Sequence, residues 1–325
     1  MTWYGHLGIT DLARFVAKKD CNHCANKLRL TRIIFFGTVL HIIHYIPSHA
    51  VELVNTMCEL MALSSERPIT TDFSFREFGK RDQQNADGWG FAWYPDRSAA
   101  IIKEPISWRA SAHTNFLQTY GAVRSTIFLG HVRHRTIGGE PTHADTHPFL
   151  RELNGHDYVF AHNGTLANLP RQSPGSRYHP VGATDSENAF CVILGRLTER
   201  KKSLSTPDDF AWLHAELKRL NEYGKLNCIL SDGRAIFCYR DDQGRGGLEW
   251  CPLQIPARRS EQFTDGEVKI AVESAGTIRA TIVATQPLGG SGWKQFSFGE
   301  LIVLRNGQDI FSSHRQEATD AALTR

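Results

Sequence analysis

The sequence predicts an α+β domain that begins near Cys58, and three features of the chain indicate this fold class. Short segments with strand-like patterns recur through most of the chain, separated by Gly, Asp and Asn turns. One segment, residues 184–199, has a clear helical periodicity. The composition, with 41% hydrophobic and 22% charged residues, is ordinary for a folded globular domain.

Five strands are predicted before the main helix. They are Cys58–Ser64, Gly88–Tyr94, Ala99–Lys103, Ile127–Arg133 and Tyr158–His162. The second and third are expected to pair across a turn at Pro95–Ser98, because proline and short polar residues interrupt the apolar pattern there. The fourth and fifth each run into a polar stretch, so polar side chains are expected at their ends.

Two helices are predicted next. In residues 184–199 the apolar side chains follow i, i+3, i+4, i+7 spacing, at Phe190, Ile193, Leu194 and Leu197. Thr184 and Glu187 have the spacing of a capping box, which marks the start of this helix. The second helix candidate is Pro207–Tyr223.

Further short strands are predicted after Leu226. They are Cys228–Ser231, Ala235–Tyr239, Lys269–Glu273, Thr281–Ala284 and Leu301–Leu304. Residues 311–325 form a polar tail that is expected to fray. The folded domain is therefore predicted to span residues 58–310.

Residues 1–57 differ from the remainder and are predicted to be an extension outside the mature protein. Their apolar run Ile33–Ile46, of about fourteen residues, is shorter than the roughly twenty that a membrane-spanning helix needs. It also lies too far from Met1 for a typical signal peptide, so we expect a buried or amphipathic helix, or a segment that is not translated, and no membrane anchor. The pair Cys21 and Cys24 is half of a zinc site, and no metal is expected there.

Charge and cysteine usage exclude some partners. Residues 1–57 hold six of the 37 Lys and Arg residues and three of the 34 Asp and Glu residues, so the chain from Cys58 onward is formally neutral. That part lacks the basic excess typical of nucleic-acid-binding proteins. The seven cysteines have scattered spacing, which does not suggest a disulfide framework and favours a reduced, cytoplasmic setting.

Five short motifs gather polar residues at predicted strand ends and helix starts, where sites are usually built. In chain order they are Met57-Cys58, Asp87-Gly88-Trp89-Gly90, Gly130-His131-Val132-Arg133, Ala161-His162-Asn163-Gly164 and Thr184-Asp185-Ser186-Glu187. Taken singly, each motif has an ordinary structural explanation. Cysteine is commonly a small buried hydrophobe, Asn-Gly is commonly a turn, and Thr-Asp commonly caps a helix.

Together the motifs supply the groups that a cysteine amidase with a free amino terminus needs. If Cys58 is the first residue, its α-amine, with an ordinary pKa of about 7.7–8.0, is a suitable base for its own thiol, whose ordinary pKa is about 8.5. Asn163 offers a side-chain N–H and Gly164 a main-chain N–H for a tetrahedral oxyanion. Arg133 suits a carboxylate and Asp185 suits an ammonium, which predicts a pocket for the head group of a free α-amino acid.

A metal site is the competing interpretation. Six histidines and an aspartate fall within a short span, namely His131, His134, His143, His147, His156, His162 and Asp145. No helical His-Glu-x-x-His pattern is present, and the segment between His143 and His147 belongs to a Thr- and Pro-containing loop. Structural or pocket-lining roles are therefore expected for these histidines, and no metal.

The ordered set of motifs resembles the class II glutamine amidotransferases of the N-terminal-nucleophile hydrolase superfamily. Within them it looks closest to the stand-alone YafJ-like branch and is similar to γ-glutamyl amidohydrolases. The resemblance runs from Cys58 to about Asn306. Besides the motifs above, it includes Thr146-His147-Pro148-Phe149, Tyr158–Gly164, Pro180–Glu187 and Val283–Leu288.

The resemblance implies a four-layer αββα sandwich with two antiparallel sheets. It implies that Cys58 is the nucleophile and that Asn163 and Gly164 form the oxyanion hole. It also implies that Arg133 binds the α-carboxylate of glutamine and Asp185 the α-amine.

Lesser members of the glutamine pocket are implied at Thr136 and His147. The sequence departs from better-known family members at Ile137, where they carry histidine, and at His134, which replaces an aromatic residue. These departures concern the finer substrate preference rather than the nucleophile.

The activity so implied is hydrolysis of the γ-amide of glutamine, or of a related γ-glutamyl compound, through a γ-glutamyl thioester. The products would be glutamate and ammonia or an amine, and no cofactor is required. No P-loop or phosphosugar-isomerase pattern follows the motifs. Either a separate synthase subunit accepts the ammonia, or the enzyme hydrolyses γ-glutamyl compounds alone.

The extension leaves three interpretations open. Translation begins at Met57 and removal of that methionine exposes Cys58, or residues 1–57 are a propeptide, or the extension is retained. In the third case Cys58 has no free amine, and the protein would be a non-catalytic, amino-acid-binding regulatory protein.

Overall fold

The computed structural model describes residues 29–35, 38–44, 58–72, 87–119, 123–133, 140–256, 260–262, 269–271, 276–288 and 290–316. The chain divides into two compact units, Met1–Asn55 and Thr56–Arg325. The second unit contains all the predicted site residues. Of these, Thr136 lies outside the described residues, as do His134, Ile137 and the pair Cys21 and Cys24 of the extension.

The first unit contains a β-hairpin. Strand β1 (Arg29–Phe35) pairs with β2 (Thr38–His44) in antiparallel register. The helix predicted for Ile33–Ile46 is therefore wrong. The physical reason is the density of β-branched Ile, Val and Thr side chains in this run, which lose rotamer freedom in a helix and suit a pleated sheet.

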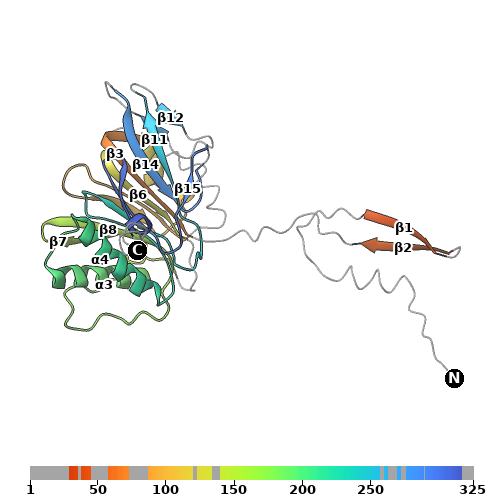
Figure 1. The fold of residues 1–325 in the computed structure, drawn as a ribbon, viewed down its shortest axis with the longest axis horizontal. Coiled ribbons are helices and arrows are strands. Elements are labelled where there is room, and N and C mark those ends of the chain that lie inside the picture. The colour runs from red at the N-terminus through yellow and green to blue at the C-terminus, as the bar shows by residue number, and fades with distance from the viewer. Residues whose placement is uncertain are drawn as a thin grey trace, which may run out of the picture. The chain divides into compact units, whose positions relative to one another are not determined.

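The second unit contains a six-stranded antiparallel sheet in the order β17-β16-β10-β9-β8-β7. Its strands are β7 (Phe149–Leu153), β8 (His156–Thr165), β9 (Lys225–Ser231), β10 (Ile236–Tyr239), β16 (Leu301–Arg305) and β17 (Gln308–Ser312). Helices α3 (Asp185–Arg200) and α4 (Pro207–Asn221) cover its outer face (Figure 1). Phe190 and Leu213 of these helices pack with Phe160 and Phe237 of the sheet.

A nine-stranded antiparallel sheet lies against the first, with the main order β15-β11-β14-β3-β6-β4-β5. Its strands are β3 (Glu59–Asp72), β4 (Trp89–Trp93), β5 (Ala100–Glu104), β6 (Arg124–Val132), β11 (Glu249–Ile255), β12 (Ser260–Gln262), β13 (Lys269–Ala271), β14 (Ile278–Ala284) and β15 (Lys294–Gln295). The short helices η2 (Trp108–Ala110) and α2 (Ala112–Thr119) contribute Trp108 and Leu117 to a cluster on its outer face.

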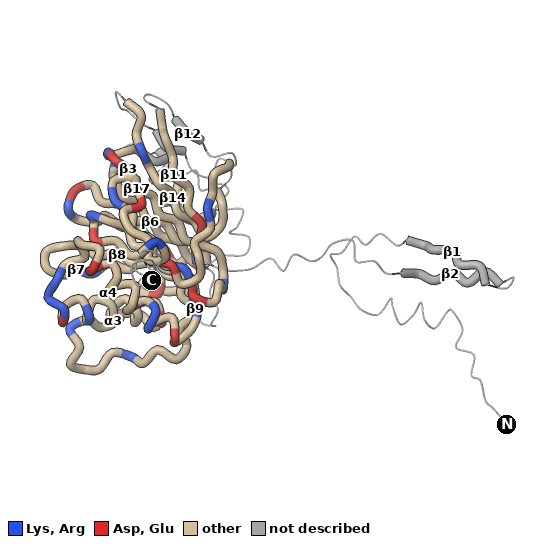
Figure 2. The backbone as a smooth tube through the Cα atoms, in the orientation of Figure 1, with Lys and Arg blue, Asp and Glu red and all other residues tan. Residues whose placement is uncertain are grey.

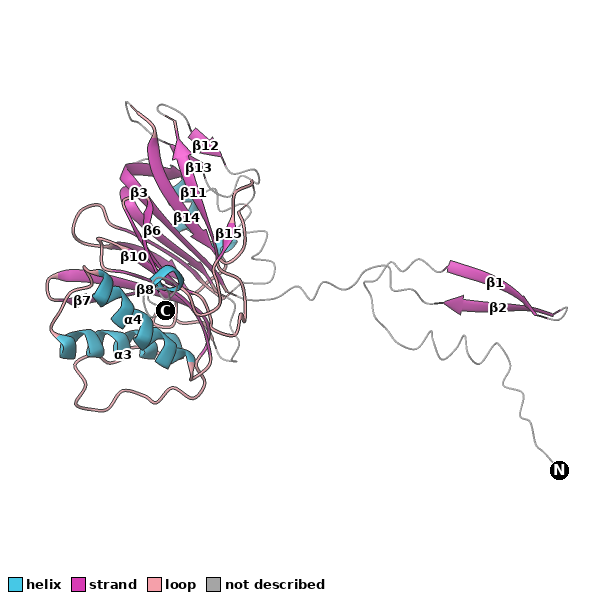
Figure 3. Cartoon of the chain, viewed as in Figure 1, coloured by secondary structure: helices cyan, strands magenta, loops and turns pink. Residues whose placement is uncertain are grey.

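The alternation of side chains along β3 explains why two sheets stack. Leu60 and Ala62 belong to the core between the sheets, while Met61 and Leu63 belong to the outer cluster. A strand buried on both faces presents successive residues to opposite sides, so one strand serves two cores. The layers are α3 and α4, two antiparallel sheets, and η2 with α2. Figure 3 shows α3 and α4 beside the strands of the second unit. The predicted α+β sandwich is confirmed.

Strand β3 extends beyond its predicted end at Ser64. The added part contains Pro68, and proline cannot donate to a sheet ladder. An irregular stretch between Ser64 and Ile69, where the register with β6 shifts, contains the proline. Strands β7, β11, β12, β15 and β17 were not predicted, since each is short or carries polar residues.

The predicted capping box at the start of α3 is half formed. The Thr184 hydroxyl accepts the Glu187 N–H at 3.2 Å. The buried Glu187 carboxylate does not return to Thr184, because it accepts the Gly182 N–H and pairs with Arg151. The spacing predicted the helix start correctly. The second hydrogen bond of the capping box is missing because Glu187 pairs with Arg151 instead.

The packed chain continues past the predicted boundary at residue 310. Ser312 and Ser313 are buried; Ser312 donates to Glu300 at 2.7 Å and Ser313 accepts the Leu301 N–H at 3.1 Å. Residues 317–325 of the predicted tail lie outside the described residues.

Charges of both signs are interspersed along the described part of the second unit (Figure 2). Among the helices that the structure describes, none has the length and apolar character needed to cross a bilayer.

Candidate active site

Cys58 and Arg133 lie at the ends of two neighbouring strands of the larger sheet, on the same side of it along the strand direction. Glu59, the first residue of β3, pairs with Val132, the last residue of β6. Cys58 precedes the one and Arg133 follows the other, so antiparallel register brings them to neighbouring strand ends. Cys58 is partly exposed and Arg133 is buried.

The Asp87–Gly90 motif supports these strand ends through its backbone. The Gly88 carbonyl accepts the Arg133 main-chain N–H at 2.8 Å. A Cβ on Gly90 would lie 2.1 Å from the His147 carbonyl oxygen, closer than any real contact. Glycine at this position therefore allows the segment that carries His147 to pack directly on β4, and the motif positions both Arg133 and His147.

Asn163 reaches Cys58 from the other sheet. It lies in β8 and is 2% exposed, and its Nδ2 donates a hydrogen bond to the Cys58 carbonyl oxygen. A side-chain amide carries two N–H groups, so one donor remains after this contact. The hydrogen bond joins the two sheets at the predicted nucleophile.

Gly164 follows Asn163 and lies opposite Leu226 of β9. The Leu226 N–H donates to Asp241 Oδ2 at 3.0 Å rather than to β8. In such a non-hydrogen-bonded pair the N–H groups face away from the partner strand. The Gly164 N–H is therefore a donor outside the β8–β9 ladder, beside the donor of Asn163.

Replacing Gly164 by Ala is expected to destabilise the fold. The added Cβ would lie 2.0 Å from the Lys225 carbonyl oxygen and 2.5 Å from His162 Nε2, and neither the backbone nor the buried ring can move freely. Overpacking of this kind lowers the free energy of unfolding by about 1–3 kcal/mol. Urea denaturation followed by circular dichroism measures the change.

Gly195→Ala is the matched control, because a Cβ there meets nothing within 4 Å and the residue lies inside α3. That variant should be stabilised by about 0.5–1 kcal/mol through helix propensity. Equal stability of the Gly164→Ala variant and the native protein would contradict the close approach at Gly164.

Asp185 begins α3 and is tied to the end of β8. Its Oδ2 accepts the main-chain N–H of Leu166, which follows β8, and its Oδ1 accepts the Ser186 N–H at 2.9 Å. These bonds fix the orientation of the carboxylate close to the strand that carries Asn163 and Gly164.

Two buried histidines, His131 and His147, are close enough to Arg133 to be affected by its charge. His131 stacks on His147 with ring centroids 4.2 Å apart. Desolvation, reinforced by the Arg133 charge, lowers the pKa of His131 to about 3. Desolvation and the neighbouring His131 likewise hold the pKa of His147 well below its ordinary value. Both rings are therefore neutral at neutral pH and add no positive charge beside Arg133.

The tautomer of His162 follows from its partners. Its Nε2 lies 3.0 Å from the Lys225 carbonyl oxygen, which only accepts, so Nε2 carries the proton. Nδ1 then accepts from the Ser186 hydroxyl at 2.9 Å. Both ring nitrogens are engaged, so His162 has a structural role. Within the described ranges, no three His, Cys, Asp or Glu side chains are grouped to hold a metal ion.

The sequence analysis did not identify Asn227 and Asp241, two buried polar residues next to the strand that carries Asn163. Asn227 Nδ2 donates to the Arg245 carbonyl at 2.9 Å and approaches the Asn163 carbonyl at 3.4 Å, while its Oδ1 accepts the Asp241 N–H at 3.1 Å. Burial raises the pKa of Asp241, but hydrogen bonds from Arg245, Leu226 and other donors lower it to about 2. An asparagine inside the apolar run of β9 was the available signal, since buried polar groups need partners.

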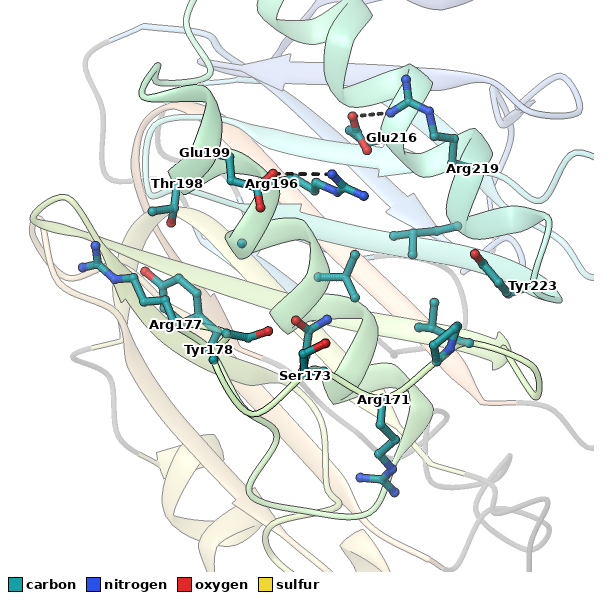
Figure 4. A pocket seen from close by; sticks show the side chains of 18 residues that line it. Arg171, Ser173, Arg177, Tyr178, Arg196, Thr198, Glu199, Glu216, Arg219 and Tyr223 are labelled. Carbon is teal, nitrogen blue, oxygen red and sulfur yellow. Dashed lines mark hydrogen bonds and ion pairs between the residues drawn. The ribbon is translucent and has the colours of Figure 1, made fainter.

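A groove of about 590 Å³ lies elsewhere, between residues 169–178 and helices α3 and α4 (Figure 4). Arg196 is paired with Glu199, and Arg219 with Glu216, within their own helices. The described site residues do not line this groove, so it is separate from the site around Cys58.

Comparison with known proteins gives one family. The family model described as "Glutamine amidotransferases class-II" matches residues 57–324. An uncharacterised protein of Methanocaldococcus jannaschii is 34% identical over 261 residues, which cover 80% of this chain and 72% of that protein. YafJ of Escherichia coli K12, provisionally named a glutamine amidotransferase, is 32% identical over 265 residues, which cover 76% of this chain and 100% of that protein.

A solved structure gives the same result. The crystal structure of a protein from Pseudomonas aeruginosa, described as a predicted glutamine amidotransferase, is 26% identical and superposes with a TM-score of 0.60. The match covers 78% of this chain and 100% of that one.

Proposed function

This chain belongs to the class II glutamine amidotransferases, and we propose that it hydrolyses the γ-amide of glutamine or of a related γ-glutamyl compound. The observation that carries the proposal is the hydrogen bond from the Asn163 side chain to the Cys58 carbonyl. It holds the residue that carries the thiol, at the end of a strand of one sheet, against the strand of the other sheet that carries Asn163 and Gly164. Acyl transfer to sulfur needs a thiol and N–H donors close together.

The amino-acid head group of the substrate binds between Arg133 and Asp185. The guanidinium of Arg133 forms a two-point contact with the α-carboxylate. The Asp185 carboxylate, held by two main-chain N–H groups, receives the α-ammonium. Opposite charges at the two ends select a free α-amino acid, and the side-chain amide then extends toward Cys58.

Cys58 acts as the nucleophile once its own α-amine is free. The amine takes the thiol proton and the sulfur attacks the γ-carbonyl carbon, which becomes a tetrahedral oxyanion. The C–N bond breaks, and the leaving nitrogen takes the proton from the α-ammonium. A γ-glutamyl thioester and ammonia, or an amine, result. Water then attacks the thioester, again with the α-amine as base, and glutamate leaves as the thiol re-forms.

The oxyanion of both tetrahedral states is stabilised by two donors. One is the second N–H of the Asn163 amide, and the other is the Gly164 main-chain N–H. Their support from Asn227 and from the β8–β9 register keeps them fixed before the substrate arrives. Preorganised donors stabilise developing charge without reorganisation, and each contributes about 10²–10³ in turnover.

Replacing Arg133 by Lys is expected to raise KM for glutamine by about tenfold or more, with a smaller change in kcat. Lysine keeps the charge but loses the forked donor geometry that grips a carboxylate. Steady-state glutamate release measures both constants. The matched control is Arg124→Lys, an exposed position on the same strand, which should leave both unchanged. An unaltered KM in the Arg133→Lys variant would remove Arg133 from the head-group site.

Two versions of the proposed activity differ in what happens to the nitrogen that is released. In one, a separate synthase subunit accepts the ammonia; in the other, the protein hydrolyses γ-glutamyl compounds alone. Affinity purification from the native host tests the first, since a stoichiometric synthase should copurify. Turnover of γ-glutamyl peptides by the purified protein without any partner supports the second.

A further inference from the structure

Lys225 brings a cation to the candidate active site from a strand that none of the predicted motifs includes. It is the first residue of β9 and pairs with Thr165, directly after Gly164 on the neighbouring strand. A Cβ on Gly246 would lie 3.0 Å from its Nζ. The ammonium thus packs against backbone at Gly246 on one side and is half-buried.

The charged and titratable groups around Lys225 come from three parts of the fold. They are Cys58 and Glu59 at the start of β3, His162 of β8, and Asp241 and Arg245 after β10. Burial lowers the pKa of Lys225, and among the opposing influences the negative charge of Cys58 is the largest, ahead of Asp241. Attraction between two charges is mutual, so the same interaction favours the thiolate of Cys58.

Two carboxylates, Asp241 and Glu59, act on this cation. Asp241 is already held by the Arg245 guanidinium at 2.8 Å, by Asn221 at 2.9 Å and by the Leu226 N–H at 3.0 Å. Asp241 therefore shares its charge between Arg245 and Lys225.

We propose that Lys225 is a positioning residue for the nucleophile, whose ammonium stabilises the thiolate form of Cys58 electrostatically. The inference rests on the proposed role of Cys58 as the nucleophile. It adds a device to that role, because a neighbouring cation increases the fraction of reactive sulfur at neutral pH whether or not the α-amine is free. It also predicts that an arginine can replace Lys225, since the charge and not an exchangeable proton is required.

The test is the pH dependence of Cys58 alkylation in the full 325-residue chain. Iodoacetamide is added over a range of pH, and mass spectrometry follows the peptide that contains Cys58. Lys225→Gln should raise the thiol pKa by about one unit and slow alkylation at neutral pH about tenfold. The described cysteines Cys191, Cys228, Cys238 and Cys251 are buried, and their peptides are followed separately.

Two further variants make the result specific. Lys225→Arg should restore the native alkylation profile, whereas Lys218→Gln, at an exposed position of α4, should leave it unchanged. An unshifted profile in the Lys225→Gln variant, or an arginine variant as slow as the glutamine variant, overturns the proposal. The assay needs no turnover, so an intact lysine effect without glutaminase activity would reject the proposed function alone.

Discussion

Replacing Cys58 by Ala is expected to abolish glutamine hydrolysis, with turnover reduced by about 10⁴-fold or more. Without the sulfur no thioester forms, and the remaining donors stabilise a state that is never reached. The fold should persist, because the contact with Asn163 uses the Cys58 carbonyl, which alanine retains. Glutamate release in a coupled assay and thermal unfolding by circular dichroism measure the two effects.

The matched control for this experiment is Cys251→Ala. Cys251 is buried in the outer-face cluster of the larger sheet, with its Sγ 3.8 Å from main-chain carbonyls, and is not among the described site residues. That variant should retain near-native turnover with a modest loss of stability. Undiminished hydrolysis in the Cys58→Ala variant would remove Cys58 as the nucleophile and with it the proposed mechanism.

Glutaminase activity is expected to require a free amine on Cys58, and this is the second large effect. A chain that retains residues 1–57 has an amide nitrogen in place of the amine, and an amide nitrogen does not accept the thiol proton. Loss of a positioned general base lowers turnover by about 10²–10⁴-fold. Intact-mass spectrometry of the protein from its native host identifies the first residue, and initial rates compare the form that begins at Cys58 with the form that begins at Met1.

Glutamine binding provides the internal control for the second experiment. Calorimetric binding without turnover in the form that begins at Met1 would show an intact head-group pocket and a missing base. Should that form also be the mature species in the host, the non-catalytic, amino-acid-binding interpretation would stand. Equal turnover by the two forms would refute the α-amine as the base.

The N-terminal cap of α3 shows which contacts can be predicted from neighbouring residues in the sequence and which cannot. Thr184 caps the helix as its spacing predicts, because the N–H that it accepts lies only three residues away. The partner of Glu187 was predicted wrongly, because Arg151 lies 36 residues away on β7 and its approach depends on how the sheet packs. The same holds at Pro68, because the strand resumes its pairing with β6 at Ile69, after a shift in register that the local sequence does not reveal.

The amino-acid sequence by itself determined the α+β pattern, the strand ends that carry polar groups, and the chemical identity of the candidate nucleophile, donors and charged head-group residues. These follow from side-chain periods and residue chemistry, which are properties of neighbouring residues.

The tertiary structure alone decided how those residues meet. The β3–β6 register sets Cys58 beside Arg133, and a one-residue slip would turn every side chain of β3 to the other face. Stacking of the two sheets brings Asn163 to the Cys58 carbonyl across 105 positions of sequence. Lys225 was not predicted either. Its charge acts on Cys58, which lies far away in the sequence, and no local pattern connects the two residues.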